Sequence, residues 1–572
     1  MTSPLFRTLA ETLQFRSCNQ PDRKAYTFLK DGEVEAGSFT YRQLDSESRT
    51  IAAMLTDWRV QRPLLIYPPG LDFIVAFFGC IYAGVTPVPA GLPHLSRIGR
   101  SLTRLSAIAT DAGSDVVLST RRVIERATAD PEFTVRSPAL ARMRWLATDE
   151  IDSEQGSAEI ASKSDGLAFI QYTSGSTSMP KGVMVSHRSL MHNLECCNVV
   201  EENDDSTVSV SWLPHSHDMG LIEAILLPVY AGYPAYLMSP AAFLRRPVRW
   251  LQAISTFGAT NSGGPNFAFD LCLERISPEQ QEGLDLRSWR VAYNGAETIR
   301  SETIRRFAHR FNRNGFRWSA FYPVYGLAES TLLVTSGRRN DSPVLQSIDS
   351  VALRKGAVQP ATDSLEAVTI VGCGRPAPGS TVVIVDPETC VECERGKIGE
   401  IWISGNSVAD GYWRRAPETE RTFRAQLAGD PHSSYLRTGD LGFLDDGKLF
   451  VTGRIKDVIN IRGFKHYPQD IERTIEEDHP ELYRNGCAAV ALPSASGDAL
   501  GIVAEVRAPI RHPVSNWRDD LIASVCKSVA MNHGIEVQTV ALVRYGTIPR
   551  TTSGKLQRHA CSRFFAGELE TA

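Results

Sequence analysis

The sequence predicts an α/β protein of more than one domain, and three observations support this fold class. Up to about residue 366, short apolar runs alternate with amphipathic stretches. From about residue 367, short strand-like runs are joined by Gly, Asp and Pro turns, and after Gly453 helix-like and strand-like runs alternate again. Alternation of strands and helices is typical of parallel sheets covered by helices, whereas closely spaced strands favour antiparallel pairing. A chain of 572 residues is also too long for one ordinary core.

The predicted elements of the N-terminal part follow in chain order. Residues 1–20 lack the pattern of a secretory signal and are predicted to form an amphipathic helix. The apolar run 73–90 is interrupted by glycines and prolines, which predicts a buried helix and then an extended segment, not a membrane span of about 20 residues. Further strands are predicted at 63–67, 235–238, 290–294 and 321–326, and helices at 246–256 and 302–311.

The C-terminal part is predicted to contain a β-rich segment and then a smaller α+β domain. The β-rich segment has strand-like runs at 367–372, 381–386, 399–405, 435–444 and 447–453. Beyond it we expect helices at 468–479 and 517–533, with strands at 487–493, 501–508 and 538–544. The change of pattern predicts two domains of ordinary size, residues 1–455 and 456–572.

Composition excludes several classes of function. Lys and Arg number 61 against 65 for Asp and Glu, so no basic excess would attract nucleic acid or a membrane surface. Eleven scattered cysteines without a signal sequence are typical of a reducing cytosol, and we expect a cytoplasmic protein without stable membrane insertion. The single Cys-x-x-Cys, at 390–393, has no second pair nearby, which favours a turn between strands over a zinc site.

The stretch Tyr172-Thr-Ser-Gly-Ser-Thr-Ser-Met-Pro-Lys181-Gly182 is the strongest functional signal. It follows an apolar strand-like run and precedes residues 183–194, which are predicted to form a helix. Small hydroxyl residues and glycine between a strand and a helix expose backbone N–H groups to phosphate, and Lys181 adds a positive charge. A flexible surface turn is the alternative that composition alone favours, and the spacing is not that of a Walker A sequence.

This loop and five later motifs resemble the signature motifs of the adenylate-forming superfamily, which includes acyl-CoA synthetases, luciferases and peptide-synthetase adenylation domains. The resemblance implies a large N-terminal domain of two α/β subdomains plus a β-subdomain, followed by a small mobile α+β C-terminal domain. The later motifs are, in order, Asn294-Gly-Ala-Glu297, Tyr325-Gly-Leu-Ala-Glu329, Arg437-Thr-Gly-Asp440, Gly453-Arg-Ile-Lys-Asp457 and Pro549-Arg-Thr-Thr-Ser-Gly-Lys555.

Within the superfamily, the chain most resembles the fatty acyl-AMP ligases. Three stretches carry this narrower resemblance, at 211–221, 262–269 and 461–471. A fourth sign is the long connection after the Tyr325 motif, in which residues 338–368 are interpreted as the insertion found in these ligases. The family associates that insertion with restraint of the small domain and with suppression of CoA thioester formation.

The resemblance assigns ATP-binding roles to the motif residues. The 173–181 loop would hold the β- and γ-phosphates, the 294–297 segment would line the base and Tyr325 would stack on it, while Asp440 would accept hydrogen bonds from both ribose hydroxyls. Glu329 would bind Mg²⁺, which prefers hard oxygen ligands shared with phosphate. The nucleotide-binding residues so implied are Thr173, Ser174, Gly175, Ser176, Thr177, Lys181, Asn294, Gly295, Ala296, Glu297, Tyr325, Gly326, Asp440 and Arg454.

Two residues are implied to act in the adenylation step. Lys555 would stabilise the phosphate while the fatty carboxylate attacks and pyrophosphate leaves, a reaction that depends on positioning and charge neutralisation. His217 would position the carboxylate and phosphates, whereas His215 is expected to be structural. Gly264 stands where the family usually has Ala, which predicts a slightly wider acyl pocket. The pocket residues implied are Trp212, Met219, Gly264, Pro265, Asn266 and Phe267.

The acyl acceptor is expected to be the phosphopantetheine thiol of a separate acyl carrier protein. Few residues follow Lys555, and the carrier-like triplet Asp363-Ser-Leu365 lies in the insertion without a four-helix pattern around it. Lys456 aligns with the hinge about which the small domain would rotate. The charged residues near it are either a docking face for an acidic carrier or an ordinary solvated surface; they are Arg454, Lys456, Arg462, Lys465 and His466.

Two alternatives stay open at this point. The first is a true fatty acyl-CoA synthetase with the same motifs. The second, from another class, is an inactive protein that senses acyl-adenylate or nucleotide, although the intact motifs argue against it. Adenylation of an amino acid is disfavoured, because the stretch 215–220 lacks the acidic pattern that would bind an amino group.

Overall fold

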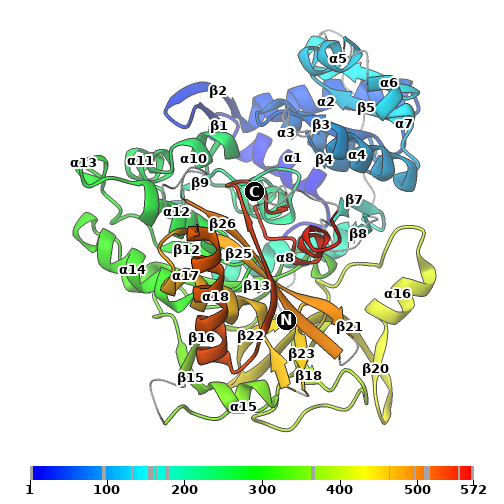
Figure 1. Ribbon diagram of the computed structural model, residues 1–572. Coiled ribbons are helices and arrows are strands. Elements are labelled where there is room, and N and C mark those ends of the chain that lie inside the picture. Colours follow the sequence, from blue (N-terminus) through cyan, green and yellow to red (C-terminus); the bar gives the residue numbers. More distant parts are fainter. Residues whose placement is uncertain are drawn as a thin grey trace. The chain divides into compact units, whose positions relative to one another are not determined.

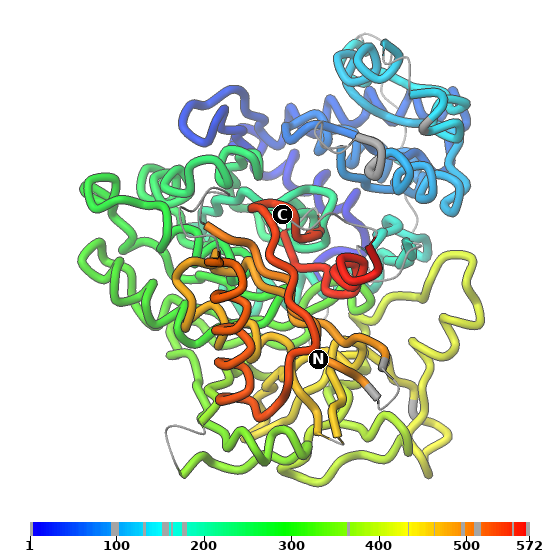
Figure 2. Tube along the Cα trace, viewed as in Figure 1, coloured from blue at the N-terminus to red at the C-terminus, as the bar shows by residue number. Residues whose placement is uncertain are grey.

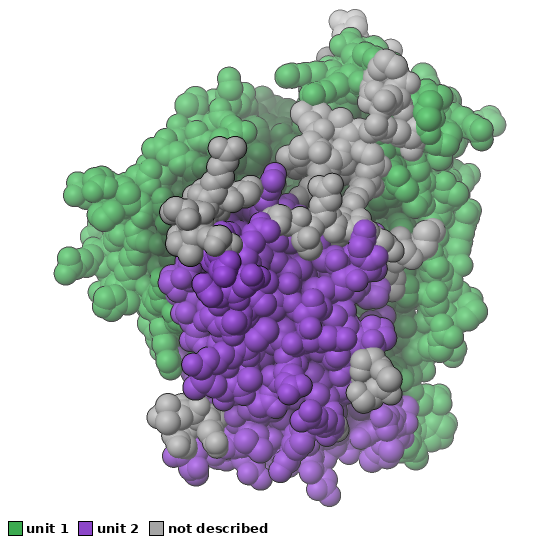
Figure 3. Space-filling model, viewed as in Figure 1, with its two compact units in different colours: residues 1–344, 373–382, 402–437 green, residues 345–372, 383–401, 438–572 purple. Residues whose placement is uncertain are grey.

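The computed structural model describes residues 4–92, 98–129, 133–151, 160–161, 164–173, 180–362, 367–462, 464–494, 497–507, 516–551 and 554–567. The chain forms two compact units (Figure 3). Unit 1 comprises residues 1–344, 373–382 and 402–437, and unit 2 comprises residues 345–372, 383–401 and 438–572. The predicted boundary between residues 455 and 456 lies inside unit 2, so as a boundary between moving domains it stays a prediction.

A nine-stranded sheet forms the centre of unit 1 (Figure 1). The six strands from β13 to β1 are parallel, and antiparallel strands lie at both edges. This agrees with the predicted strand–helix alternation. From edge to edge the strands are β17 (Arg375–Pro376), β14 (Leu333–Ser336), β13 (Phe321–Gly326), β12 (Val291–Asn294), β11 (Asn261–Gly264), β9 (Ser209–Ser211), β10 (Ala235–Met238), β1 (Lys24–Lys30) and β2 (Val34–Thr40).

A second, four-stranded parallel sheet explains the apolar run at 73–90. Its strands are, in order, β4 (Val88–Gly91), β3 (Leu64–Tyr67), β5 (Val116–Ser119) and β6 (Arg144–Ala147). Helix α3 (Asp72–Tyr82) joins β3 to β4 and is buried from Phe73 to Tyr82. The predicted core helix and extended segment are therefore confirmed. Within the described ranges, no helix is long and apolar enough to cross a membrane.

The helices of unit 1 include those predicted from amphipathic patterns. Helix α2 begins with a capping box, in which Thr40 and Gln43 satisfy each other's backbone N–H groups. Helix α14 buries Ile304, Phe307 and Phe311. The helices are α1 (Leu9–Asn19), α2 (Tyr41–Asp57), α4 (Ile98–Ala112), α5 (Arg121–Thr128), α6 (Phe133–Arg136), α7 (Pro138–Ala141), α8 (His187–Val200), α9 (Leu227–Ala231), α10 (Pro240–Arg245), α11 (Val248–Phe257), α12 (Asn266–Arg275), α13 (Pro278–Gln281), α14 (Ser301–Phe311) and α16 (Ala416–Phe423).

The segment after the predicted phosphate loop differs from the sequence prediction. Residues 183–194 were expected to be helical, but β8 (Gly182–Ser186) pairs antiparallel with β7 (Leu167–Tyr172), and α8 begins only at His187. Ser186 caps α8 by accepting a hydrogen bond from the Ser189 backbone N–H. Residues 173–181 therefore lie between two antiparallel strands, and not directly before a helix as the sequence predicted.

The β-rich segment predicted from residue 367 is antiparallel, as expected. Strands β19 and β21 each continue along the chain from one unit into the other, and Figure 2 traces this path. The predicted insertion contributes one strand and a short helix to unit 2, and its strand β15 pairs with β16, which begins at the end of the insertion. The elements are β15 (Leu345–Asp349), α15 (Ser350–Arg354), β16 (Ala367–Val371), β18 (Ser380–Val385), β19 (Gly399–Gly405), β20 (Ala425–Leu427), β21 (Asp430–Asp445) and β22 (Lys448–Arg454).

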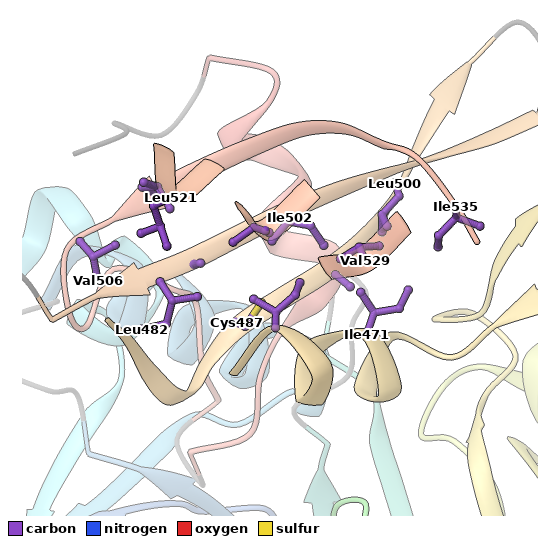
Figure 4. Close-up of a cluster of buried hydrophobic side chains, with 14 of the residues drawn as sticks. Ile471, Leu482, Cys487, Leu500, Ile502, Val506, Leu521, Val529 and Ile535 are labelled. Atoms are coloured by element: carbon purple, nitrogen blue, oxygen red, sulfur yellow. The ribbon is translucent and has the colours of Figure 1, made fainter. Parts of the chain in front are cut away.

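The last part of unit 2 is an α+β fold around a three-stranded sheet. Strands β25 (Leu482–Ser494) and β26 (Gly497–Val506) are antiparallel, and β27 (Val537–Val543) is parallel to β26. Ile471, Ile502 and Val529 meet in a fully apolar core between this sheet and two helices (Figure 4). The remaining elements are β23 (Ile459–Ile461), β24 (Phe464–His466), α17 (Pro468–Asp478), α18 (Trp517–His533) and α19 (Arg558–Cys561).

Candidate adenylate-binding site

The carboxyl ends of the parallel strands in unit 1 carry most of the predicted binding residues. Gly264 on β11 is the register partner of Asn294 on β12, and Asn294 is in turn the partner of Pro323 on β13. Ligands of open α/β sheets bind at this edge. The register thus brings the predicted acyl pocket and the predicted base-binding segment together. The residues that directly follow β9, β11 and β12 are Trp212, Pro265 and Gly295.

The 294–297 segment presents an unusual buried acceptor. Asn294 is fully buried, and its side-chain oxygen Oδ1 has no hydrogen-bond partner among the residues that the structure describes. Such an atom is costly unless a ligand donor binds it, and the exocyclic amine of adenine is a suitable donor. Ala296 has a φ of 67°, and the Glu297 carboxylate accepts a hydrogen bond of 2.7 Å from the Phe267 backbone N–H. Glu297 therefore fixes the start of α12.

Gly264 does not widen the acyl pocket, so that prediction is wrong. A Cβ atom at position 264 would lie 2.7 Å from Cζ2 of Trp212, which shows that the indole ring already fills the space beside the glycine. The ring is held there by stacking on Phe243, with centroids 4.1 Å apart, and by an edge contact with Phe267 at 6.0 Å. Trp212, Phe267 and Gly264 therefore lie together, as the predicted pocket requires.

His217 lies at the start of an unusual helix. The segment η3 (Met219–Leu226) is a π-helix, a form that occurs mostly at functional sites. The His217 Nδ1 and Asp218 Oδ1 atoms are 2.5 Å apart, and both side chains keep a small exposed fraction. His215 is different: its ring stacks on Phe73 at 4.1 Å, and desolvation lowers its pKa to about 4. His215 is thus neutral and structural, which matches the expectation.

The two ends of the predicted phosphate loop are joined by a hydrogen bond. The Thr173 backbone N–H donates to the Lys181 carbonyl oxygen at 3.1 Å, and Arg104 donates to the Thr173 carbonyl at 3.0 Å. Lys181 forms an ion pair of 2.8 Å with Glu418, which lowers the pKa of that carboxyl. The predictions for Ser174, Gly175, Ser176 and Thr177 fall outside the described residues.

Tyr412 is a site residue that the sequence analysis missed. Its hydroxyl donates a hydrogen bond of 2.8 Å to Glu329, and the Lys181 ammonium lies 4.9 Å from the centre of its ring. Burial, and then the Glu329 charge, raise the pKa of the Tyr412 hydroxyl, which therefore stays a donor. Tyr412 links the predicted phosphate ligand to the predicted metal ligand. It reaches them because its neighbour Trp413 donates to the Gly182 carbonyl, a long-range contact that no motif spacing indicates.

Glu329 fits a magnesium ligand of a particular kind. In the parts of the chain that the structure describes, no group of three or more His, Cys, Asp or Glu side chains could hold a metal ion. Mg²⁺ commonly uses one or two carboxylates and takes its other oxygens from phosphates and water. The half-buried Glu329 carboxylate, oriented by Tyr412, agrees with a cation that is shared with a nucleotide.

The predicted ribose ligand is found in unit 2. Asp440 on β21 is buried and is the register partner of Arg454 on β22. The Arg454 Nε and Asp440 Oδ1 atoms are 2.9 Å apart, although the arginine side chain is 61% exposed. The strand pair therefore presents an acceptor and a donor side by side. Lys456, the predicted hinge residue, is exposed and is the second residue after β22.

Lys555 lies in a turn of unit 2 that is closed by short-range hydrogen bonds. The Gln557 backbone N–H donates to the Pro549 carbonyl at 2.9 Å, and the Thr551 N–H donates to the Lys555 carbonyl at 2.8 Å. The Thr551 hydroxyl also accepts a bond of 3.0 Å from the Lys555 N–H. Gly554 has a φ of 86°, a conformation that favours glycine and fixes the turn before Lys555.

His466 cannot belong to a basic docking face. It is buried, and burial together with the nearby Arg354 charge lowers its pKa to about 4, so the ring is neutral near pH 7. Arg454, Lys456 and Arg462 are exposed. Any docking face for an acidic partner would therefore rest on these cations without the histidine.

The fold and the motif geometry together define an adenylate-forming enzyme. Residues 14–413 match the AMP-binding enzyme family, and the chain belongs to that family. Residues 456–572 match the AMP domain of Disco-interacting protein 2-like proteins. This second match begins at the predicted hinge residue.

Similar proteins narrow the class. The chain is 43% identical over 584 residues to the medium-chain-fatty-acid–[acyl-carrier-protein] ligase JamA of Moorena producens, covering 100% of this chain and 97% of that protein. It is 36% identical to a putative fatty-acid–CoA ligase of Mycobacterium tuberculosis, covering 96% of each chain. The solved fatty acyl-adenylate ligase of Legionella pneumophila, in complex with acyl adenylate and pyrophosphate, matches with 39% identity and a TM-score of 0.77, covering 98% of this chain and 96% of that chain. The predicted resemblance to the fatty acyl-AMP ligases is confirmed, and the protein is a ligase.

Proposed function

We propose that this protein activates a medium- or long-chain fatty acid with ATP to an acyl-adenylate, and then transfers the acyl group to the phosphopantetheine thiol of a separate acyl carrier protein. The observation that carries the proposal is the strand edge of unit 1. There the orphaned Asn294 acceptor and the apolar Trp212–Gly264 contact lie on adjacent strands. The Asn294 acceptor suits a nucleotide base, and the apolar surface around Trp212 and Gly264 suits an acyl chain.

Each part of ATP would be bound by a different motif residue. The 173–181 loop and Lys181 bind the β- and γ-phosphates, Asn294 accepts a hydrogen bond from adenine, and Tyr325 stacks on the base. Asp440 binds the ribose hydroxyls, and Arg454 reaches the ribose or a phosphate. Glu329 would hold Mg²⁺, which when bound neutralises phosphate charge.

In the adenylation step, the fatty carboxylate attacks the α-phosphorus. The bond to the bridging oxygen of pyrophosphate breaks, and pyrophosphate leaves with that electron pair. Lys555 stabilises the charge that develops on the phosphate, and His217 positions the attacking carboxylate. In the transfer step the carrier thiolate attacks the acyl carbonyl and AMP leaves, so no cysteine of this chain is needed as a nucleophile.

Contacts of the insertion within unit 2 support an acceptor other than CoA. Arg354 on α15 donates a hydrogen bond of 3.0 Å to the His533 carbonyl at the end of α18. Leu353 is buried in one cluster with Val458 and Tyr467, which both follow the predicted hinge residue Lys456 in the chain. These contacts would restrain rotation about Lys456, and the fatty acyl-AMP ligases associate such restraint by the insertion with suppression of CoA thioester formation.

A chain-length series tests the proposal. The protein is incubated with ATP, Mg²⁺ and saturated acids from C6 to C18, either without an acceptor or with CoA or phosphopantetheinylated carrier added. Acyl-AMP, acyl-CoA and the acylated carrier are then quantified by mass spectrometry. We expect acyl-AMP to form when neither CoA nor the carrier is added. When the carrier is added, we expect the acyl group to be transferred to it. Acyl-CoA formation equal to or above acyl-AMP release would instead establish a CoA synthetase, the activity that the name of one relative carries.

Pyrophosphate exchange separates enzyme from sensor. We expect exchange that depends on fatty acid in the wild type and that disappears in Lys555→Ala. A wild type without such exchange would establish the nucleotide or acyl-adenylate sensor instead.

A further inference from the structure

Two buried carboxyl groups in unit 1 have no role in the function proposed above. Glu201, at the C-terminal cap of α8, and Glu223, within the π-helix η3, are both buried. Their side chains are hydrogen-bonded to each other. A carboxylate has no donor, so this bond requires that the pair hold a proton.

The surroundings of the pair favour that shared proton. The Asn203 and Asn261 side-chain amides each donate a bond of 3.0 Å to Oε2 of Glu201. Burial raises the pKa of Glu201 to about 7 although these amide donors oppose the rise, and burial and the Glu201 charge raise the pKa of Glu223 still further above its usual range. The other titratable groups facing the pair are neutral at pH 7; they are Cys197 from α8, Tyr233 after α9, Tyr293 from β12 and Tyr322 from β13. Two negative charges there would repel without a compensating cation.

The π-helix connects this pair to His217. The His217 backbone N–H donates to the Pro214 carbonyl at 3.0 Å, and the His217 carbonyl accepts a bond of 2.8 Å from Leu221 of η3. Gly220 also packs directly on this loop, since a Cβ there would lie 2.0 Å from the Pro214 oxygen. A rotation or a change of winding in η3 therefore moves the His217 backbone.

A π-helix needs a contact that keeps its wider winding. The Leu227 N–H donates to the Ile222 carbonyl, five residues back, so Glu223 lies at the wide turn itself. An α-helical winding would rotate every following side chain, and Glu223 would lose its partner. We propose that the protonated Glu201–Glu223 pair is a positioning device for adenylation, which holds η3, and through it His217 and Met219, in the register that the acyl-phosphate site requires.

The test compares three variants of the full chain and rests on the proposed function, because its readout is fatty-acid-dependent pyrophosphate exchange. Glu223→Gln keeps an uncharged hydrogen bond to Glu201, Glu223→Leu removes it, and Phe307→Leu is a matched control for lost core stability in α14 of the same unit. The kcat, the KM for acid and for ATP, and the Tm are measured from pH 6 to pH 9.

We expect Glu223→Leu to lower kcat/KM for the acid at least about 10-fold at a temperature where it is folded, because misplacement by about 1 Å can cost 10²-fold. The KM for ATP should stay within about threefold. Glu223→Gln should stay within about threefold of wild type at pH 7. Wild-type activity should fall as rising pH removes the shared proton, and Glu223→Gln should lack that fall, since its amide does not ionise.

Two results would overturn the positioning role: a Glu223→Leu enzyme whose kcat/KM matches Phe307→Leu at equal loss of Tm, or a Glu223→Gln enzyme with the alkaline fall of wild type. Absence of exchange in the wild type would instead overturn the proposed function, so the two failures are distinguishable.

Discussion

The predicted functional residues of the two units are held in place by different kinds of contact. In unit 1, Asn294, Gly264 and Trp212 are aligned by the register of parallel strands from distant parts of the chain. In unit 2, Lys555 lies in a turn closed by bonds between residues 549 and 557. Substitutions in unit 1 should therefore change binding and stability together, whereas Lys555 can be changed with little effect on folding.

The largest expected effect is that of Lys555→Ala. We expect exchange to fall by about 10²–10³-fold, since one charge-stabilising contact is worth this much in a transition state. The free energy of unfolding should change by only about 0.5 kcal/mol, the usual range for a substitution outside a packed core. Exchange kinetics and urea unfolding of the same preparation check both values. A parallel loss of stability and activity would remove the contrast between the units.

Gly264→Ala should show the opposite behaviour. The added methyl group would overlap Trp212, so we expect a loss of about 1–3 kcal/mol in the free energy of unfolding, as for other overpacked cores, with a higher KM for the acid. The double variant Gly264→Ala with Trp212→Phe makes room for the methyl group and should recover part of both losses. Additive effects in this double-mutant cycle would show that the two residues do not interact.

Tyr412→Phe tests the link between Lys181 and Glu329. It removes one hydrogen bond to a charged group, worth about 1.5–3 kcal/mol, while it keeps the ring beneath the ammonium. We expect the concentration of Mg²⁺ that gives half-maximal exchange to rise about 10-fold. Tyr412→Leu, which also removes the cation–π contact, should raise it further. An unchanged Mg²⁺ dependence in both variants would contradict a metal role for Glu329.

A pH dependence of stability is also expected in unit 2. Burial, and then Arg354, lower the pKa of both His466 and His533 to about 4. The unfolded chain therefore binds more protons than the folded one between pH 6.5 and 4, so stability is present above pH 6.5 and is lost as the pH falls. For each histidine, we expect the equilibrium constant for folding to fall by up to about tenfold per pH unit in this range. Hydrogen exchange of α17 and α18 measures this, and Arg354→Gln should reduce the dependence.

Sequence patterns predicted most elements but not all of their contacts. The core helix α3 and the strands β3, β10, β12 and β13 were predicted from their apolar runs, whereas β1, β5, β6, β9 and β11 were not. The helix prediction at 183–194 failed at its start, because the apolar run of β8 leads directly into α8, although Ser186 is a recognisable cap. His466 was read as a surface residue, since its burial depends on contacts with α15 across more than a hundred residues.

The candidate site was predictable as a set of motifs and not as a geometry. The motifs named Asn294, Glu329 and Lys181, and strand register brings the first of these to the expected edge. Tyr412 and the Glu201–Glu223 pair were missed, because their significance arises from hydrogen bonds between segments that are distant in sequence. The π-helix was also missed, because a mostly apolar segment such as 219–226 shows no alternation of polar and apolar residues from which its winding could be predicted.

The hairpin that carries the phosphate loop has a consequence for how such enzymes diversify. Tyr172 and Gly182 are register partners, and Thr173 is bonded to Lys181, so the two ends of the loop are joined to each other whatever residues lie between them. The segment between them is thus anchored at both ends independently of its own sequence. Single substitutions between these ends should therefore change turnover without moving the strands, since loop residues can vary on a constant framework.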